Sequence, residues 1–378
     1  MELSLVFAVV LIALVFEYIN GFHDTANSIA TVVATKVLSP GQAVFLAAAM
    51  NLLGALWGTA VAKTIASGLI DTGVVDVGAM ILICALMGGV IWNLITWWWG
   101  LPSSSSHALV GGLVGAAFAA AGDSWDAIIW NVPGGEHWWQ GKGLLPKVVI
   151  PMIISPLAGF ILGIVIMGTL FALFSFLADR RGFLQKIGRP RVANALFGKL
   201  QIVSASAMGW AHGSNDAQKT MGIIALALAS ATVAGQLDGL PSWLNFLRVE
   251  SAAGKTFEIA LWIKLTCAIV MAAGTAAGGW RIIKTLGHKM VKLHPVHGFA
   301  AESASATMIL TASSMGIPVS TTHNISAAIM GVGAAKRLNA IKWTVVERMV
   351  WAWILTIPVS AVLAYALVKL AHGVGLPI

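Results

Sequence analysis

Residues 100–107 read GLPSSSSH, and residues 316–323 read GIPVSTTH. Each stretch places a proline, a run of hydroxyl side chains and a histidine inside a chain that is mostly apolar. Proline interrupts a helix, and serine and threonine are good residues to start the next one. The two stretches therefore predict broken helices at two matching places in the chain, Pro102 and Pro318.

The composition around these stretches is that of a membrane protein. Of 378 residues, 58% are hydrophobic and only 10% are charged, and the mean hydropathy is +0.86. A soluble domain carries about a quarter charged residues. Apolar runs approach or exceed the roughly 20 residues that cross a bilayer, and in lipid such runs must be helical. We expect a multispanning all-α membrane protein whose apolar runs are Leu3–Phe16, Ala43–Val61, Ala79–Trp99, Val148–Leu177, Ile259–Gly279 and Val345–Leu370.

The charged loops indicate how the chain is oriented. Residues 179–199 form the densest basic stretch, which we place in the cytoplasm because positive loops stay inside. Acidic or mixed loops alternate with the basic ones. This rule accounts for the net charge of +8 without a nucleic-acid partner.

The two halves of the chain resemble each other. GFHDTAN at 21–27 aligns with GSNDAQK at 213–219, and a hydroxyl turn follows each of them. We interpret this as an internal duplication, with membrane repeat 1 at 1–178, a basic cytoplasmic loop at 179–199 and membrane repeat 2 at 200–378. The alternating loop charges indicate that the repeats are inverted and that both termini lie outside. Inverted repeats with broken and re-entrant helices that meet at a midplane site are typical of secondary transporters.

The hydroxyl turns have the chemistry of an anion site. A helix that restarts after Pro102 or Pro318 exposes free N–H groups and the positive end of its dipole. Two such helix starts facing each other would surround a tetrahedral oxyanion. The simpler alternative is that the hydroxyls only cap helices, but a duplicated turn favours a ligand site. The candidate substrate-binding residues are Ser104, Ser105, Ser106, Ser320, Thr321 and Thr322.

Asp24 and Asp216 occupy matching positions in the aligned motifs. An ionisable residue at membrane depth is costly and indicates a functional site. In a helix Asp24 shares a face with Asn27, and Asp216 shares a face with Lys219. Oxygen ligands on one face suit a hard cation. The Lys219 ammonium could take the place of that cation, face the anion, or form a structural ion pair with Asp216.

The histidines do not indicate a single role. His107 and His323 end the two hydroxyl turns, and each could bind a ligand, relay protons or bond a neighbouring carbonyl. A second group lies among lysines, so we expect a solvated loop rather than a metal site there. This group comprises His288, His294 and His297.

These motifs resemble those of the inorganic phosphate transporter (Pit) family, which is related to eukaryotic sodium-phosphate cotransporters. The resemblance runs from GFHDTANSIAT to GIPVSTTHNISAA. It implies that the hydroxyl turns hold phosphate, and that the coupling-ion residues are Asp24, Asn27, Asn215, Asp216 and Lys219. Glu302 also resembles an acidic position of the family, although Leu86 occupies its place in the first half.

His23, Gln218 and Lys219 depart from the common motif. They resemble the proton-coupled bacterial branch, which accepts phosphate as a neutral complex with a metal such as Mg²⁺ or Ca²⁺. The resemblance therefore implies a symporter in a bacterial cytoplasmic (inner) membrane, driven by protons rather than sodium. No residue pattern reports the oligomeric state, and a homodimer is the candidate assembly.

The same motifs allow other functions besides proton-coupled phosphate import. Monohydrogen phosphate can donate a proton to Asp24 or Asp216, whereas sulfate cannot, so we expect these carboxylates to select phosphate. A sodium-coupled phosphate symporter, a sulfate permease and a passive anion channel stay open. An intramembrane protease is disfavoured because no Gly-x-Ser-x-Gly stretch occurs. We expect no enzyme, no cofactor and no catalytic residue.

Overall fold

The computed structural model describes residues 3–67, 69–71, 73–75, 77–180, 189–249 and 258–376. This part of the chain forms helices and loops with two isolated β-bridges and no strand, which confirms the all-α prediction. The α-helices are α1 (Leu3–Ala34), α2 (Pro40–Ala55), α3 (Ala60–Ser67), α4 (Ala79–Trp99), α5 (Ser105–Ala120), α6 (Ile150–Ala178), α8 (Pro190–Val233), α9 (Leu261–Ala277), α10 (Trp280–Lys284), α11 (Pro295–Ser314), α12 (Thr321–Lys336) and α13 (Trp343–Gly373). Short 3₁₀ and π segments join them at η1 (Trp125–Ala127), η2 (Trp138–Gln140), η3 (Leu145–Val149), η4 (Ser242–Leu247), η5 (Thr285–Lys289) and η6 (Leu338–Ala340).

Several helices are long and apolar enough to cross a membrane. Among the described residues there are four such helices, α1, α4, α6 and α13, or up to six spans if each of two bent helix pairs counts as one. The pairs are α2 with α3, bent by 70°, and α9 with the segment from α10 to Lys289, bent by 58°. The prediction of one unbroken run over Ala43–Val61 is therefore wrong, because α2 ends at Ala55 and the chain turns before α3.

The predicted breaks at the two hydroxyl turns are confirmed. Helix α4 ends before Gly100, whose φ is +64°, and α11 ends before Gly316, whose φ is +67°. Only glycine adopts this left-handed backbone without a steric cost. The proline two residues later then keeps the chain extended until α5 and α12 begin. Each turn thus reverses the chain inside the bundle.

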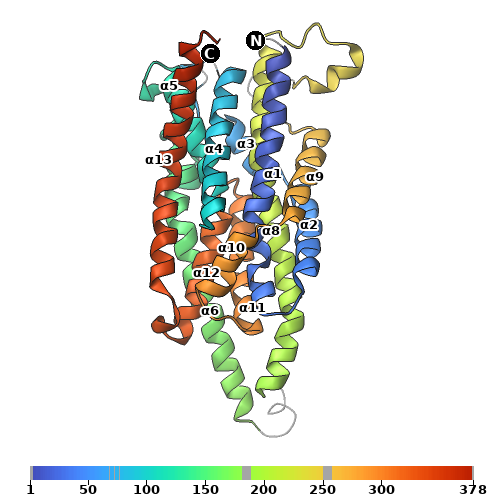
Figure 1. Ribbon diagram of the computed structural model, residues 1–378, viewed down its shortest axis with the longest axis vertical. Coiled ribbons are helices and arrows are strands. Elements are labelled where there is room, and N and C mark those ends of the chain that lie inside the picture. Colours follow the sequence, from blue (N-terminus) through green and yellow to red (C-terminus); the bar gives the residue numbers. More distant parts are fainter. Residues whose placement is uncertain are drawn as a thin grey trace.

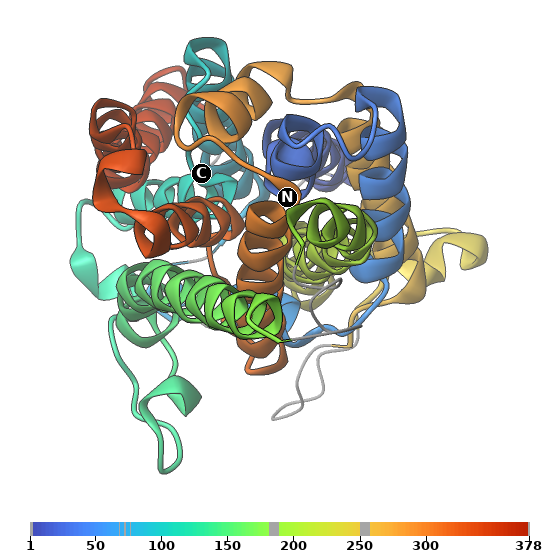
Figure 2. The same ribbon diagram turned by 90° about the horizontal axis from the view of Figure 1, so that it is seen from below.

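The helices of the two halves make matching contacts. Helix α1 packs on α4 and α9, while α8 packs on α11 and α2; α5 packs on α13, and α12 packs on α6. Figure 2 shows α6 lying beside α12 and α11. Helix α1 begins and α13 ends at one end of the molecule, whereas α8 begins at the opposite end (Figure 1). This arrangement is the one expected for inverted repeats; the repeat relationship and the side on which the termini lie stay predictions.

Helix α8 is longer than expected. It begins at Pro190, so residues 190–199, predicted as part of the basic loop, are helical. Residues 181–188 of that predicted loop lie outside the described residues. With 44 residues, α8 is about 66 Å long, about twice the hydrocarbon thickness of a bilayer. Its first turns therefore extend beyond the bundle, alongside the end of α6 (Figure 1).

A polar layer divides the apolar core. Buried apolar side chains form two clusters, and the division falls on α1 between Ile19 and Ala26 and on α8 between Ala211 and Ala217. The motif aspartates, Asp24 and Asp216, lie within these two intervals. The fold thus brings the motif residues of both halves to the same level of the bundle.

Candidate functional site

Both hydroxyl turns lie in the polar layer, and their serine and threonine side chains are 4% exposed or less. Ser104 and Ser320 are the N-caps of α5 and α12, because each Oγ accepts the backbone N–H of the histidine three residues on, at 3.2 Å and 3.1 Å. These two hydroxyls therefore have the capping role that was the simpler alternative. The other four lie in the first turn of each helix and contact the motif residues.

Asp24 on α1 gathers contacts from both halves. Its Oδ2 accepts the Ser105 hydroxyl at 3.0 Å, and its Oδ1 accepts the Thr322 hydroxyl at 3.3 Å. His23 Nδ1 lies 2.7 Å from the same Oδ1. Asp24 is 2% exposed, so these contacts replace the water that would otherwise solvate the carboxylate.

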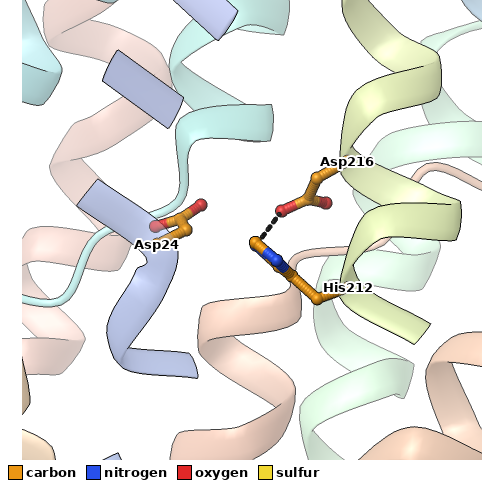
Figure 3. Close-up of side chains that lie close together, drawn as sticks. All are labelled: Asp24, His212 and Asp216. Atoms are coloured by element: carbon orange, nitrogen blue, oxygen red, sulfur yellow. Dashed lines mark ion pairs between the residues drawn. The ribbon is translucent and has the colours of Figure 1, made fainter. Parts of the chain in front are cut away.

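Asp216 on α8 has a different set of partners. Lys219, one turn on, forms an ion pair with Oδ1, and Thr321 donates to Oδ2 at 2.9 Å. His212, one turn before, brings its Nε2 to 3.1 Å from Oδ2. Figure 3 shows His212 directed at Asp216, with the carboxylate of Asp24 facing the pair from the other helix.

Asn27 and Lys219 link the halves in a reciprocal way. Asn27 Nδ2 donates to Thr321 at 3.1 Å and to Thr322 at 2.9 Å. Lys219, at the matching position, contacts Ser106 of the first hydroxyl turn and donates to the Val319 carbonyl at 3.1 Å. Each half therefore places the residue three positions after its motif aspartate against the hydroxyl turn of the other half. Such crossed contacts tie the two halves together at the site.

His107 and His323 meet directly. Their rings lie edge to face with centroids 4.7 Å apart, and His323 stacks on Trp353 at 4.2 Å. Among the described residues, His107 Nδ1 and His323 Nε2 are buried and have no hydrogen-bond partner. A bond from these two atoms to a carbonyl, one of the three roles left open, is therefore not seen in the part of the chain that the structure describes.

Asn215 lies in the layer but faces away from the carboxylates. Its Nδ2 donates to Ser313 at 2.8 Å and to the Ile317 carbonyl at 3.3 Å, so it holds the turn between α11 and α12. Its Oδ1 has no partner. Asn215 thus contacts the hydroxyl turn through the backbone rather than through the side chains of the turn.

Glu302 lies on α11 outside this constellation. It is fully buried and accepts hydrogen bonds from Thr31, Ser204 and Gln201, the last at 3.2 Å. Thr31 is seven residues beyond Asp24 on α1, which corresponds to about 10 Å along the helix. The carboxylate therefore forms a separate polar cluster at that distance.

Two residues of the site, His212 and Asn51, were not predicted from the sequence. His212 faces Asp216 at the helical spacing i, i+4, a signal that could have been found. Asn51 on α2 orients His212, since its Oδ1 lies 3.1 Å from His212 Nδ1, and its Nδ2 donates to Thr275 at 2.9 Å. No local pattern marks Asn51, because it lies within an apolar helix of the other half.

The histidine group near 288–297 is only partly solvated. His288 and His294 are exposed as expected, but His297 is 6% exposed and accepts the backbone N–H of His294 at 3.2 Å. It lines a cavity of about 210 Å³ together with Lys336 and Arg337. The prediction of a solvated loop is therefore wrong for His297, which belongs to the buried start of α11.

The site could also hold a cation. One ligand atom each of Asp24, His212 and Asp216 lie within 4.8 Å of one another, and all three residues are buried. Two carboxylate oxygens and an imidazole nitrogen match the donor set of several divalent metals. The Lys219 ammonium already neutralises part of this charge through Asp216.

Comparisons with known proteins agree on one family. The model of the Phosphate transporter family matches residues 20–364. A Bacillus subtilis protein named "Probable low-affinity inorganic phosphate transporter" is 40% identical, over 96% of this chain and 95% of its own length. A Rhizobium meliloti protein of the same name is 41% identical, over 95% and 94%. A solved structure titled "The sodium-dependent phosphate transporter" has the same fold, with a TM-score of 0.77 and 22% identity over 98% of this chain and all of that one.

Proposed function

The chain belongs to the phosphate transporter family, and we propose that it is a symporter that imports inorganic phosphate across a bacterial cytoplasmic membrane. The observation that carries the proposal is the meeting of two hydroxyl-capped helix starts, α5 and α12, over the Asp24, Asp216 and Lys219 side chains. In the proposed membrane orientation, both termini lie outside the cell and residues 179–199 face the cytoplasm.

The chemistry of this layer suits phosphate. The N-termini of α5 and α12 present backbone N–H groups and positive dipole ends, which favour an anion. Four hydroxyls, Ser105, Ser106, Thr321 and Thr322, now bond protein partners that phosphate oxygens would replace. The Lys219 ammonium supplies a positive charge at the same place. Ser104 and Ser320 act indirectly by fixing the two helix starts.

The carboxylates supply selectivity. A protonated phosphate oxygen can donate to Asp24 or Asp216, whereas sulfate offers only lone pairs and would be repelled. His107 and His323 end the two hydroxyl turns, and the contact between their rings joins the starts of α5 and α12. Asn215 holds the second hydroxyl turn in position through the Ile317 carbonyl. Glu302 belongs to a separate polar cluster and stabilises the packing of the helices around the site.

We propose that protons rather than sodium drive the import. In the first half Asn27 Oδ1 is buried, has no hydrogen-bond partner among the described residues, and could ligate a cation. In the second half the matching residue is Lys219, whose ammonium already contacts Asp216 and Ser106. A fixed ammonium removes the need for sodium on that side, since it supplies the same charge. Sodium coupling is the alternative, and the fold likeness to a sodium-dependent transporter does not decide between them.

The substrate could travel with a divalent metal. Asp24, His212 and Asp216 would hold the metal of a neutral metal-phosphate complex, with the phosphate oxygens on the hydroxyl turns. The two carboxylates and the phosphate oxygens supply the oxygen ligands that Mg²⁺ and Ca²⁺ prefer, and the His212 imidazole would also accept a transition metal. The metal here is cargo and not a resident cofactor.

Uptake into vesicles tests the proposed function. Proteoliposomes should accumulate labelled phosphate above its external concentration, saturably, and excess sulfate should not compete. Equilibration without accumulation would favour a passive anion channel. Equal competition by sulfate would favour a general oxyanion permease. Protein-free liposomes are the control for leakage.

A further inference from the structure

Glu17 is a buried carboxyl to which the proposed function gives no role. It lies on α1, is fully buried, and precedes Asp24 by seven residues. Two helical turns bring it back to the same face of α1, about 10 Å from Asp24 toward the start of the helix. It precedes the residues matched by the family model, and its counterpart in the aligned second half is Gly209. The duplication therefore does not account for it.

The surroundings of Glu17 leave its charge poorly compensated. Its Oε2 accepts the Thr220 hydroxyl at 2.5 Å, while Oε1 has no hydrogen-bond partner among the residues that the structure describes. No ion pair among the described residues includes Glu17. A charged carboxylate in such a place is costly unless it takes up a proton or a cation. The Asn20 amide, one turn on, also interacts with the Glu17 carboxyl, while its own Oδ1 is buried without a donor among the described residues.

Glu302 provides the contrast within the same molecule. It is equally buried, yet three side chains donate to it, so both of its oxygens are occupied. Glu17 keeps one oxygen free. Of the two buried carboxyls that the structure describes outside the central layer, only Glu17 has an oxygen without a hydrogen-bond partner, where a proton can be gained and lost during transport.

Glu17 is tied to the substrate layer through α8. Thr220, its partner, directly follows Lys219 and lies one turn after Asp216. The titratable groups that face Glu17 are Asp216 and Lys219 on α8 and Cys267 on α9. A change in the charge of Glu17 therefore acts on the ion pair that holds the substrate layer together. Helices α1 and α8 pack side by side along this stretch (Figure 1).

We propose that Glu17 is the binding site of the coupling proton, on the side of the substrate layer toward the start of α1. Water delivers the proton to Oε1, which becomes an O–H group, and no other bond forms or breaks. The neutral carboxyl leaves Lys219 free for phosphate. The ionised carboxylate competes with Asp216 for the same ammonium and so disfavours the loaded state. This inference rests on the proposed proton-coupled import.

The test separates coupled accumulation from exchange. Wild-type protein, Glu17→Gln and the neighbouring exposed control Tyr18→Phe are reconstituted, and each is assayed in two ways. One assay measures phosphate accumulation driven by an inward proton gradient; the other measures exchange of internal for external phosphate at equal pH. We expect Glu17→Gln to lose accumulation about tenfold while its exchange stays within about twofold of wild type. Tyr18→Phe should match wild type in both.

Two other results for these variants contradict the proposal, and a second measurement decides if Glu17→Gln does not assemble. Unchanged accumulation in Glu17→Gln means that the proton binds elsewhere. Loss of both activities in Glu17→Gln and Glu17→Asp, in monodisperse protein, means that Glu17 is structural. If Glu17→Gln does not assemble, wild-type protein is treated with a hydrophobic carbodiimide, which adds the O–H of a protonated carboxyl across its C=N bond. Modification at Glu17 that abolishes accumulation but spares exchange supports the proposal, and an unmodified Glu17 contradicts it.

Wild type itself reports on the proposed function. If wild type shows neither accumulation nor exchange, the assignment as a phosphate transporter fails. If wild type exchanges phosphate but accumulates it only with sodium, the proton coupling fails and Glu17 loses its proposed role.

Discussion

Asn27 donates a hydrogen bond to Thr322 across the two halves of the chain, at 2.9 Å. The matching pair, Lys219 and Ser106, is also in contact. The same position thus performs the same linking task in each half, once with an amide and once with an ammonium. This one difference underlies the proposed coupling to protons.

Replacing Lys219 by asparagine should therefore change the cation requirement. Lys219→Asn leaves the buried Asp216 without its ammonium, and a small cation should be needed to neutralise it. We expect proton-driven phosphate uptake to fall by about tenfold or more and to recover in part when sodium is added. The measurement is labelled uptake against sodium concentration. Lys342→Asn, at an exposed residue, is the control, and a variant indifferent to sodium would contradict the idea of a built-in cation.

Removing the charge of Asp24 should weaken anion selectivity. Asp24→Asn keeps an acceptor for Ser105 and Thr322 but no longer repels a fully ionised oxyanion. Phosphate uptake should drop, and sulfate should begin to compete with what is left. If Asp24→Asn takes up phosphate like wild type and sulfate still does not compete, Asp24 does not select the anion. Asp126→Asn, at an exposed residue of the 3₁₀ segment η1, is the matched control.

Capping and ligand contact can be separated within one hydroxyl turn. Ser104→Ala removes the N-cap of α5 and should lower the free energy of unfolding by about 1 kcal/mol. Ser106→Ala removes a hydroxyl in contact with Lys219 and should raise the KM for phosphate more than it lowers stability. Thermal unfolding in detergent and uptake kinetics measure the two effects. Equal effects of both variants on KM and stability would mean that the turn acts as one structural unit.

A buried hydrogen bond away from the site should contribute to stability alone. Trp92 Nε1 donates to Thr356 at 3.0 Å, joining α4 to α13. Thr356→Val leaves the indole N–H without an acceptor and should destabilise the protein by roughly 0.6–1.7 kcal/mol without changing the KM for phosphate. Thr311→Val, at an exposed hydroxyl bonded only within its own helix, should be neutral. A change in KM for Thr356→Val would show that α13 communicates with the site.

The sequence predicted the parts of this protein that local chemistry controls. Proline and glycine mark the breaks before α5 and α12, and the duplicated motifs mark the residues that meet in the polar layer. The break between α2 and α3 was missed because the apolar run continues through it without a proline. The other features depend on contacts between helices that are distant in the sequence. Examples are the contact of Asn51 with His212 and the hydrogen bond from Thr220 to Glu17. No periodicity within either segment reports such partners.

The most direct test of the central claim is uptake of labelled phosphate into proteoliposomes with an inward proton gradient and no sodium, with and without magnesium. The account predicts accumulation without sodium, and greater accumulation when magnesium is present. Absence of uptake until sodium is added would contradict it and would make a sodium-coupled symporter the better description of this site.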